Sequence, residues 1–267
     1  MTYALNVMTF NIRHGRALDG KYRWSRRREL VFDVIRRYEP HLLGLQEVDP
    51  FQLDELTETF PTYGVIAHRR YGGIVGAYAP VLFDTARLET EESGDFWLSP
   101  EPDGERVRAW DAAVVRICTW AIMRDRISGS SFAIFNSHFD QRGVEARLHS
   151  ARIVAARLHR LAHLPRLFTV DLNANESSEP LAILVGTGLR DSYRDVHPPD
   201  DEPAFTYHRF RGTKSRGVLG KIDFILCDRR WAVRSTRIVR DDREGRWPSD
   251  HYPLTAELVL RNMAGAE

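Results

Sequence analysis

The sequence predicts an α/β fold that contains mixed β-sheets. Two kinds of segment alternate along the chain: short runs rich in β-branched and aromatic residues, and longer stretches with apolar residues three and four positions apart. Some short runs follow one another closely enough to pair as hairpins, which adds antiparallel pairing to the parallel pairing that helical crossovers produce. No Pro-, Gly- or Ser-rich linker divides the chain, so we expect one domain over residues 1–267.

The strand predictions rest on short apolar runs that are bounded by polar or turn-forming residues. The runs expected to form strands are residues 4–10, 42–45, 113–123, 132–136, 167–170, 222–227 and 254–260.

The helix predictions rest on apolar residues that recur at the spacing of one helix face. This spacing predicts helices over residues 26–38 and 144–161, and shorter helices over 51–59 and 179–184. The run Arg26-Arg27-Arg28 opens the first helix, and we expect these arginines to face solvent.

The composition is that of a globular chain with balanced charge. Of its 267 residues 43% are hydrophobic, and 38 Lys and Arg against 37 Asp and Glu give a net charge of +1. This balance argues against an acidic disordered tail and against a protein that binds polyanions over its whole surface. The only lysines are Lys21, Lys214 and Lys221. Codon bias explains the arginine excess, and so would a use of arginine forks on phosphate.

The two cysteines and the apolar segments indicate a cytoplasmic protein. Cys118 and Cys227 lie far apart, each inside an apolar run, so we expect two buried reduced thiols rather than a disulfide or a metal site. No apolar stretch has the length of a membrane span, and residues 1–10 lack the pattern of a signal peptide. We expect neither a membrane contact nor an obligate protein partner.

Several apolar runs end in polar side chains that suit a site better than a core. Any one of them is most simply explained as a turn or cap residue. Together they form an oxygen-rich set with two histidines, which suits a hard cation such as Mg²⁺. The set consists of Asn11, Glu47, His138, Asp171, Asn173, Asp250 and His251.

Motifs of other enzyme classes are absent from the sequence. It has no H-E-x-x-H or C-x-x-C pattern, which disfavours zinc. It also has no phosphate-binding Walker loop, no G-x-G-x-x-G and no G-x-S-x-G, which disfavours nucleotide-binding folds and serine hydrolases.

Six motifs, in order, resemble those of the endonuclease/exonuclease/phosphatase superfamily of DNase I-like proteins. The resemblance covers residues 8–258 and implies a four-layer α/β sandwich: two mixed β-sheets packed face to face, with helices outside and the site at one rim. The motifs are Thr9-Phe10-Asn11-Ile12-Arg13, Leu45-Gln46-Glu47-Val48, Asn136-Ser137-His138, Asp171-Leu172-Asn173, Lys221-Ile222-Asp223-Phe224 and Ser249-Asp250-His251.

The resemblance implies a metal site and catalytic residues. Glu47 resembles the principal Mg²⁺ ligand, with Asn11 beside it and Asp250 as a further ligand, and Mn²⁺ would be a substitute ion.

Five further residues take catalytic roles in this comparison. Asp171 resembles the carboxylate that orients or deprotonates the attacking water, and Asn173 the amide that fixes water and phosphate. His251 resembles the imidazole on the scissile phosphate, with Asp223 holding its ring, and His138 the second histidine, which donates to a phosphate oxygen. Such an allotment meets the needs of phosphoester cleavage: neutralised oxygens, an in-line water and a proton for the leaving group.

Two positions depart from the family pattern. Val170 stands where the family usually has Gly, which puts the local geometry in question, and Ser137 stands where it usually has Thr.

Charge along the chain bears on the substrate. Residues 39–59 hold six acids and residues 89–105 hold seven, with no Lys or Arg in either, whereas residues 206–247 hold twelve Lys and Arg against five acids. A basic loop before Asp223 would grip a substrate, although a solvated loop explains it equally well. Its candidate substrate-binding residues are His208, Arg209, Arg211, Lys214 and Arg216.

These observations favour a Mg²⁺-dependent phosphoesterase whose substrate is a phosphorylated small molecule or a short nucleic acid. A duplex-binding enzyme is expected to carry a longer basic stripe. The alternatives are a DNA or RNA nuclease and a non-catalytic phosphate-binding module that retains the fold.

Overall fold

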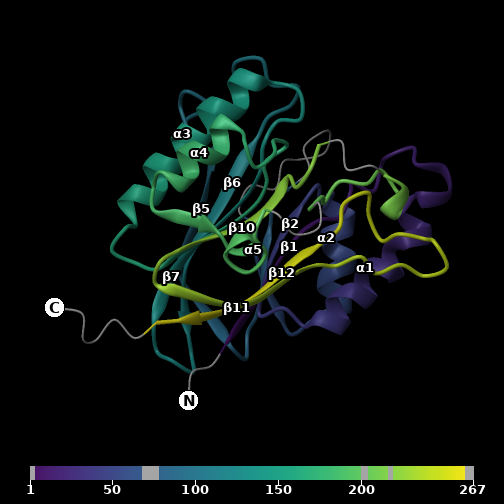
Figure 1. Ribbon diagram of the computed structural model, residues 1–267, viewed down its shortest axis with the longest axis horizontal. Helices are drawn as coiled ribbons and strands as arrows, with labels where there is room; N and C mark the ends of the chain where they lie inside the picture. The colour runs from purple at the N-terminus through teal and green to yellow at the C-terminus, as the bar shows by residue number, and fades with distance from the viewer. Residues whose placement is uncertain (1–3, 68–77, 200–203, 216–218, 262–267) are drawn as a thin grey trace.

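Two mixed six-stranded β-sheets lie face to face in the computed structural model, with helices on their outer faces (Figure 1). The structure describes residues 4–67, 78–199, 204–215 and 219–261. Over this part of the chain the sequence prediction of a four-layer α/β sandwich is confirmed.

The first sheet has the strand order β11-β12-β1-β2-β4-β3. Its strands β1 and β2 are parallel and its other neighbours antiparallel, and helix α1 makes the crossover that a parallel pair requires. The elements are β1 (Leu5–Asn11), α1 (Trp24–Tyr38), β2 (Leu42–Gln46), α2 (Pro50–Thr59), β3 (Tyr63–Ile66), β4 (Val81–Asp84), β11 (Trp231–Ile238) and β12 (Leu254–Leu260).

The second sheet has the order β5-β6-β7-β8-β10-β9, and helix α3 connects its parallel pair β7 and β8. Its elements are β5 (Leu88–Trp97), β6 (Ile117–Asp125), β7 (Ser131–His138), α3 (Val144–Arg160), β8 (Arg166–Asp171), α4 (Glu179–Val185), β9 (Leu189–Asp191), α5 (Ser192–Val196) and β10 (Asp223–Asp228). Two short 3-10 turns, η1 (Gly20–Tyr22) and η2 (Gly212–Lys214), lie in loops.

Three apolar cores separate the four layers. One fills the space between the sheets and includes Val7, Ile134 and Leu254. A second packs the second sheet against α3 and α4, and the third packs the first sheet against α1 and α2. Alternation of side chains along each strand produces this arrangement, because successive residues point to opposite faces of a sheet.

The topology brings the predicted polar residues to one edge. The parallel strands β1 and β2 end together, with Asn11 opposite Gln46, and β7 and β8 end with His138 opposite Asp171. Strand β10 runs antiparallel to β8, so its first residue, Asp223, also lies opposite Asp171. The ends of five strands therefore meet at this edge, which is where ligand sites form in open α/β sheets.

Every predicted strand and helix is present; β12 has the predicted ends, and the others differ by up to four residues at one or both ends. The strand expected from residue 113 begins at Ile117, because the N–H groups of Ala113 and Val114 instead bond to Asp140 in a loop. The prediction missed β3, β4, β5, β9, β11 and α5.

Two other predictions have clear outcomes. Cys118 and Cys227 are buried free thiols, as expected. The expectation for Arg27 was wrong: its side chain is 1% exposed, because its guanidinium donates to backbone carbonyls inside the molecule, whereas Arg26 and Arg28 are exposed.

Among the described residues, no helix is both long and apolar enough to cross a bilayer, and the cytoplasmic location stays a prediction.

Candidate active site

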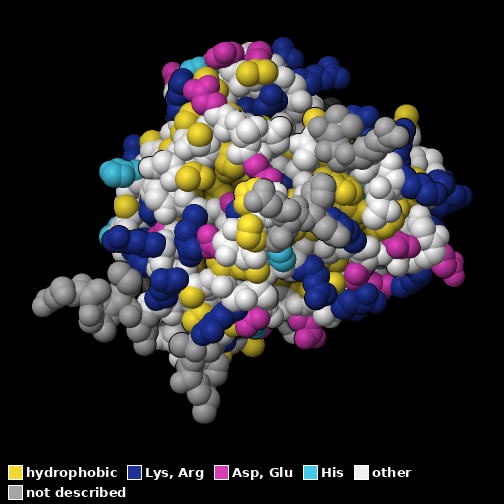
Figure 2. All heavy atoms as spheres, in the orientation of Figure 1, with side chains coloured by type: hydrophobic (Ala, Val, Ile, Leu, Met, Phe, Trp, Pro, Cys, Tyr) yellow, Lys and Arg dark blue, Asp and Glu magenta, His cyan; other side chains and the backbone are white. Residues whose placement is uncertain are grey.

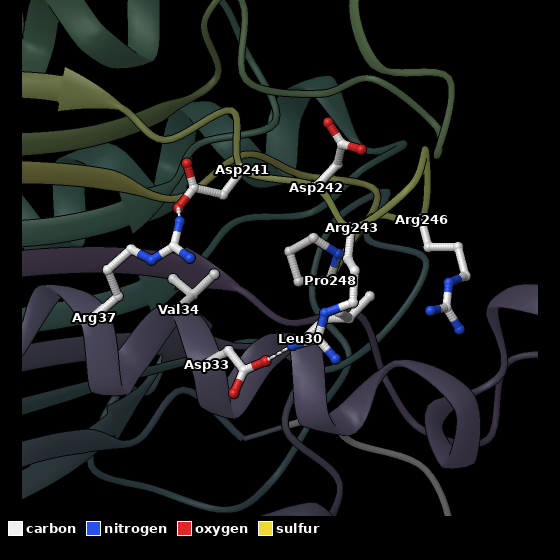
Figure 3. A pocket seen from close by; sticks show the side chains of 9 residues that line it. All are labelled: Leu30, Asp33, Val34, Arg37, Asp241, Asp242, Arg243, Arg246 and Pro248. Atoms are coloured by element: carbon white, nitrogen blue, oxygen red, sulfur yellow. Dashed lines mark hydrogen bonds and ion pairs between the residues drawn. The ribbon is translucent and has the colours of Figure 1, made fainter.

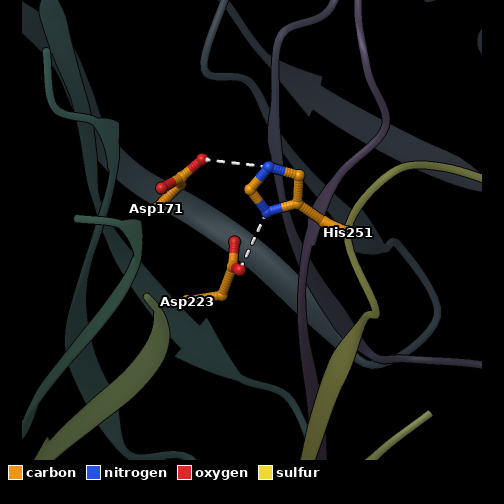
Figure 4. A group of neighbouring side chains, drawn as sticks. All are labelled: Asp171, Asp223 and His251. Atoms are coloured by element: carbon orange, nitrogen blue, oxygen red, sulfur yellow. Dashed lines mark hydrogen bonds and ion pairs between the residues drawn. The ribbon is translucent and has the colours of Figure 1, made fainter. Parts of the chain in front are cut away.

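The imidazole of His251 lies between two carboxylates (Figure 4). Its Nδ1 is 2.9 Å from Oδ2 of Asp223, and its Nε2 is 3.8 Å from Oδ2 of Asp171. All three residues are buried. Burial lowers the pKa of His251, but the charges of Asp223 and Asp171 outweigh burial and raise the pKa well above its usual value. The ring is therefore an imidazolium at neutral pH, with Nε2–H facing the site.

Asp171 has a perturbed pKa of its own. Burial, together with the charge of Asp223, raises its pKa well above that of an ordinary aspartate, while His251 and a hydrogen bond from Asn11 oppose the change. The Nδ2 group of Asn11 donates to Oδ2 of Asp171 over 2.8 Å. A carboxylate with a raised pKa is suited to accept a proton at neutral pH.

Asn173 connects Asp171 to His138. Its backbone N–H donates to Oδ1 of Asp171, and its Nδ2 lies 3.0 Å from the carbonyl of Phe139 and 2.8 Å from Nε2 of His138. The same Nε2 of His138 lies 3.3 Å from Oδ2 of Asp171. Burial and the charge of Arg116 lower the pKa of His138 well below its usual value, while the charge of Glu47 opposes the change.

Glu47, Asp250 and Arg13 form a charged cluster beside these residues. Nη1 of Arg13 is 3.7 Å from Oε2 of Glu47, and its Nε is 3.9 Å from Oδ2 of Asp250. Burial raises the pKa of Glu47, but the charges of His138 and Arg13, followed by His251 and the N–H of His14, outweigh burial and lower the pKa to about 2. Burial, with the charge of Glu47 adding to it, raises the pKa of Asp250.

Strained backbone gathers around this edge. Five non-glycine residues of the site and its neighbouring loops have left-handed φ angles, at a cost on the order of 1 kcal/mol each, which tertiary contacts must offset. They are Arg13 (56°), Glu47 (58°), Asn173 (50°), Arg209 (53°) and Phe210 (56°).

Thr206 joins the segments that carry Asp223 and His251. Its Oγ1 accepts the N–H groups of Ile222 at 3.1 Å and of Asp223 at 3.2 Å, and its carbonyl accepts the N–H of Tyr252 at 2.8 Å. Its side chain is fully buried. Thr206 therefore fixes the start of β10 relative to the loop that holds the imidazole.

His208 is buried, whereas the described basic residues of the loop are exposed. It stacks on Tyr252 with ring centroids 4.0 Å apart and accepts the N–H of Gly212 at Nδ1. Burial lowers the pKa of His208 to about 3, so it is a neutral support for the loop rather than an exposed contact. Arg209, Arg211 and Lys214 are exposed, and Arg216 lies outside the described residues.

His208 donates its backbone N–H to the carbonyl of Asp250 over 2.8 Å. Arg209 contacts the site in the same way. Its backbone N–H donates to the carbonyl of Asp250 over 3.1 Å. Its guanidinium lies over the ring of Tyr207, which in turn contacts the ring of His251 with centroids 4.8 Å apart.

Both departures from the family pattern point away from the site. Val170 is fully buried in the core beneath α3 and α4, on the opposite face of β8 from Asp171. The hydroxyl of Ser137 donates to the carbonyl of Ile117 over 2.8 Å. Neither substitution alters the catalytic edge.

The prediction assigned no role to Arg13, Thr206 or Arg116. Arg116 lies directly before β6, has Nε 3.5 Å from Oδ2 of Asp140, and interacts electrostatically with Glu47 and Asp171. Arg13 stands within the first of the six sequence motifs, which was the available signal. Arg116 carried no signal, because only the fold brings it close to His138.

A small cavity of about 50 Å³ lies elsewhere, between α1 and residues 241–248 (Figure 3). Arg37 and Asp241 form an ion pair of 2.8 Å across it, and Asp33 pairs with Arg243. None of the predicted site residues lines this cavity. These ion pairs hold the segment that leads to Asp250 against α1.

A sequence profile of the Endonuclease/Exonuclease/phosphatase family matches residues 8–251. The chain belongs to this family.

Solved structures agree with this assignment. The endonuclease/exonuclease/phosphatase protein of Bacteroides vulgatus is 31% identical, covers 97% of this chain and 100% of its own, and superposes with a TM-score of 0.88. A mannosyl-6-phosphatase of Bacteroides thetaiotaomicron is 28% identical over 96% of this chain and 100% of its own, with a TM-score of 0.85. The chain spans about half (54%) of a curated relative, the uncharacterized protein L388 of Acanthamoeba polyphaga mimivirus, with 24% identity over 146 residues and 51% of this chain.

Proposed function

We propose that this protein is a Mg²⁺-dependent phosphoesterase that acts on a small phosphorylated molecule or a short nucleic-acid strand. The arrangement of His251 between Asp223 and Asp171 carries the proposal, because it provides a proton donor and a proton acceptor at the same site. The family assignment supports a phosphoester as the bond that is hydrolysed.

The residues at the edge fit a hard divalent cation. The charge of Glu47 raises the pKa of Asp250, and Arg13 lies 3.7 Å from Glu47 and 3.9 Å from Asp250. Oδ1 of Asn11 accepts the N–H of Arg13 and retains a second lone pair. We assign Glu47, Asp250 and Asn11 to Mg²⁺, with Mn²⁺ as a substitute. Such an ion, when bound, supplies positive charge to a non-bridging phosphate oxygen.

The protein's own groups then account for both proton transfers. Asp171 accepts a proton from the attacking water as the new P–O bond forms. The imidazolium of His251 gives its Nε2 proton to the leaving oxygen as the old P–O bond breaks, and Asp223 holds the ring at Nδ1. Asn173 holds Asp171 through its backbone N–H, and its Oδ1 is left to accept a hydrogen bond from the water.

His138 is the second histidine of the site. We propose that it donates to a phosphate oxygen, as the family resemblance implies; its Nε2 lies 2.8 Å from Nδ2 of Asn173 and 3.3 Å from Oδ2 of Asp171.

The charge distribution favours a small or short substrate over a duplex. Figure 2 shows Lys and Arg spread among acidic and neutral side chains over the visible face, without a continuous basic stripe. The likeness to a mannosyl-6-phosphatase supports a phosphorylated small molecule. A nuclease remains the second candidate because the family includes endo- and exonucleases, and a non-catalytic phosphate-binding module is the third.

The test is a panel of phosphomonoesters, phosphodiesters, oligonucleotides and plasmid DNA, assayed with Mg²⁺ and with Mn²⁺. Hydrolysis should disappear in EDTA and in Glu47→Ala, Asp171→Asn and His251→Ala, whereas Glu58→Ala on the exposed face of α2 should keep full activity. Binding without turnover by the wild type would indicate the non-catalytic module. Cleavage of duplex DNA as fast as the best small substrate would establish a nuclease instead.

The basic loop has its own test. Replacing Arg209, Arg211, Lys214 and Arg216 by Gln should raise KM for the true substrate with little change in the melting temperature. An unchanged KM would show that the loop is only solvated.

A further inference from the structure

Three hydrogen bonds fix the backbone of Arg13. Its φ angle of 56° is left-handed, although it carries a side chain. Its backbone N–H donates to Oδ1 of Asn11 over 2.9 Å. Its carbonyl accepts hydrogen bonds from Nη2 of Arg27 at 2.6 Å and from Nε2 of Gln52 at 3.1 Å. These contacts offset the backbone strain and fix the position of the backbone from which the Arg13 side chain extends.

Arg27 is the buried residue that organises this loop. Its guanidinium also donates to the carbonyls of Ile12, Tyr22 and Pro248. Within the described ranges no carboxylate forms a hydrogen bond or ion pair with it; burial lowers its pKa to about 10, with Asp250, Asp19 and Glu47 acting only through their charge. A planar group with five donors can join four carbonyls at once, which a lysine ammonium cannot do. Arg27 thereby ties the exit of β1 to the segment that precedes Asp250.

The side chain of Arg13 is fixed by Asp19 and points to the carboxylates. Nε and Nη2 donate to the two oxygens of Asp19 over 3.1 and 3.2 Å. Nη1 is 3.7 Å from Glu47 and makes no hydrogen bond to the described residues. The side chain is 29% exposed, so a ligand can reach it.

We propose that Arg13 is a substrate-binding residue whose guanidinium contacts the phosphate of the substrate, with Arg27 and Asp19 as its positioning residues. This inference rests on the proposed function, because a phosphate brought to the cation that Glu47 and Asp250 hold comes within reach of Nη1. A guanidinium forms short, charge-assisted hydrogen bonds with phosphate oxygens.

The experiment measures binding of inorganic phosphate by calorimetry in the presence of Mg²⁺, alongside Mn²⁺ affinity without phosphate. Arg13→Ala should bind phosphate about 10- to 100-fold more weakly than the wild type, the range expected for loss of a charged hydrogen bond. Arg13→Lys should lie between the two. Arg16→Ala is the matched control, because Arg16 is exposed on the same loop and has no ion pair among the described residues.

Mn²⁺ affinity separates phosphate binding from a role in holding the metal ligands. Removing a cation beside Glu47 and Asp250 should leave Mn²⁺ binding unchanged or tighter. Unaltered phosphate binding in Arg13→Ala would overturn the inference, and so would a loss of Mn²⁺ affinity that parallels the loss of phosphate. If the wild type neither binds phosphate nor hydrolyses any ester, the proposed function itself fails.

Discussion

The contacts of Thr206 lead to a prediction that stability and catalysis can both test. Replacing Thr206 by Val keeps the shape of the side chain but removes the acceptor for the N–H groups of Ile222 and Asp223. Both residues are 1% exposed, so these donors cannot turn to water instead. An unsatisfied buried donor costs about 1–3 kcal/mol, and the two together should lower the free energy of unfolding by about 2–6 kcal/mol. A domain of ordinary stability would still fold.

The assay combines urea unfolding at 25 °C with steady-state kinetics on the best substrate of the panel. Thr206→Val should also reduce kcat, because the start of β10 carries Asp223 and Asp223 holds the imidazole of His251. Thr206→Ser retains the hydroxyl and should restore both kcat and most of the stability. A Thr206→Val variant within 0.5 kcal/mol of the wild type, with unchanged kcat, would refute the reasoning.

Three further predictions concern acid stability, sheet packing and the metal. Burial opposes ionisation of Asp140, but the backbone N–H groups that it accepts lower its pKa to about 2. An unfolded aspartate titrates near 4. The ionised Asp140 therefore adds about 1–2 kcal/mol to the free energy of unfolding above pH 4, and this contribution is lost as the pH falls toward 2. Urea titrations should show the unfolding free energies of the wild type and Asp140→Asn converging near pH 2. A Cβ on Gly44 would lie 2.1 Å from Oγ1 of Thr169, so Gly44→Ala should cost about 1–3 kcal/mol and Thr169→Ala should recover part of it in the double mutant. Glu47→Gln should weaken Mn²⁺ binding measured by calorimetry, while Glu58→Gln should bind like the wild type, and equal affinities would exclude Glu47 as a ligand.

Strand and helix patterns in the sequence were sufficient for the central layers of the fold. Strands β1, β2, β7, β8 and β10 are largely buried and each contains an apolar run, so the sequence pattern identifies them. Strand β5 was missed because its segment Glu89-Thr90-Glu91-Glu92 lies at a sheet edge, where solvent accepts acidic residues and no apolar pattern is required.

The burial of Arg27 could not be predicted from the sequence pattern. Three consecutive arginines at a helix start suggest an exposed face, and only tertiary structure could provide the four carbonyls that take one of them inside. Likewise, the pairing of Arg13 with Glu47 and Asp250 spans segments that are distant in sequence.

The sequence by itself determined the α/β class, the positions of the central strands along the chain and which polar residues follow them, because these are local properties of spacing and hydrophobic pattern. Tertiary structure alone decided how the ends of five strands converge, which carboxylates lie on either side of His251 and which arginines face Glu47. Distances between segments, burial and the resulting pKa shifts arise only when both sheets pack, and the chemistry of the site depends on those quantities.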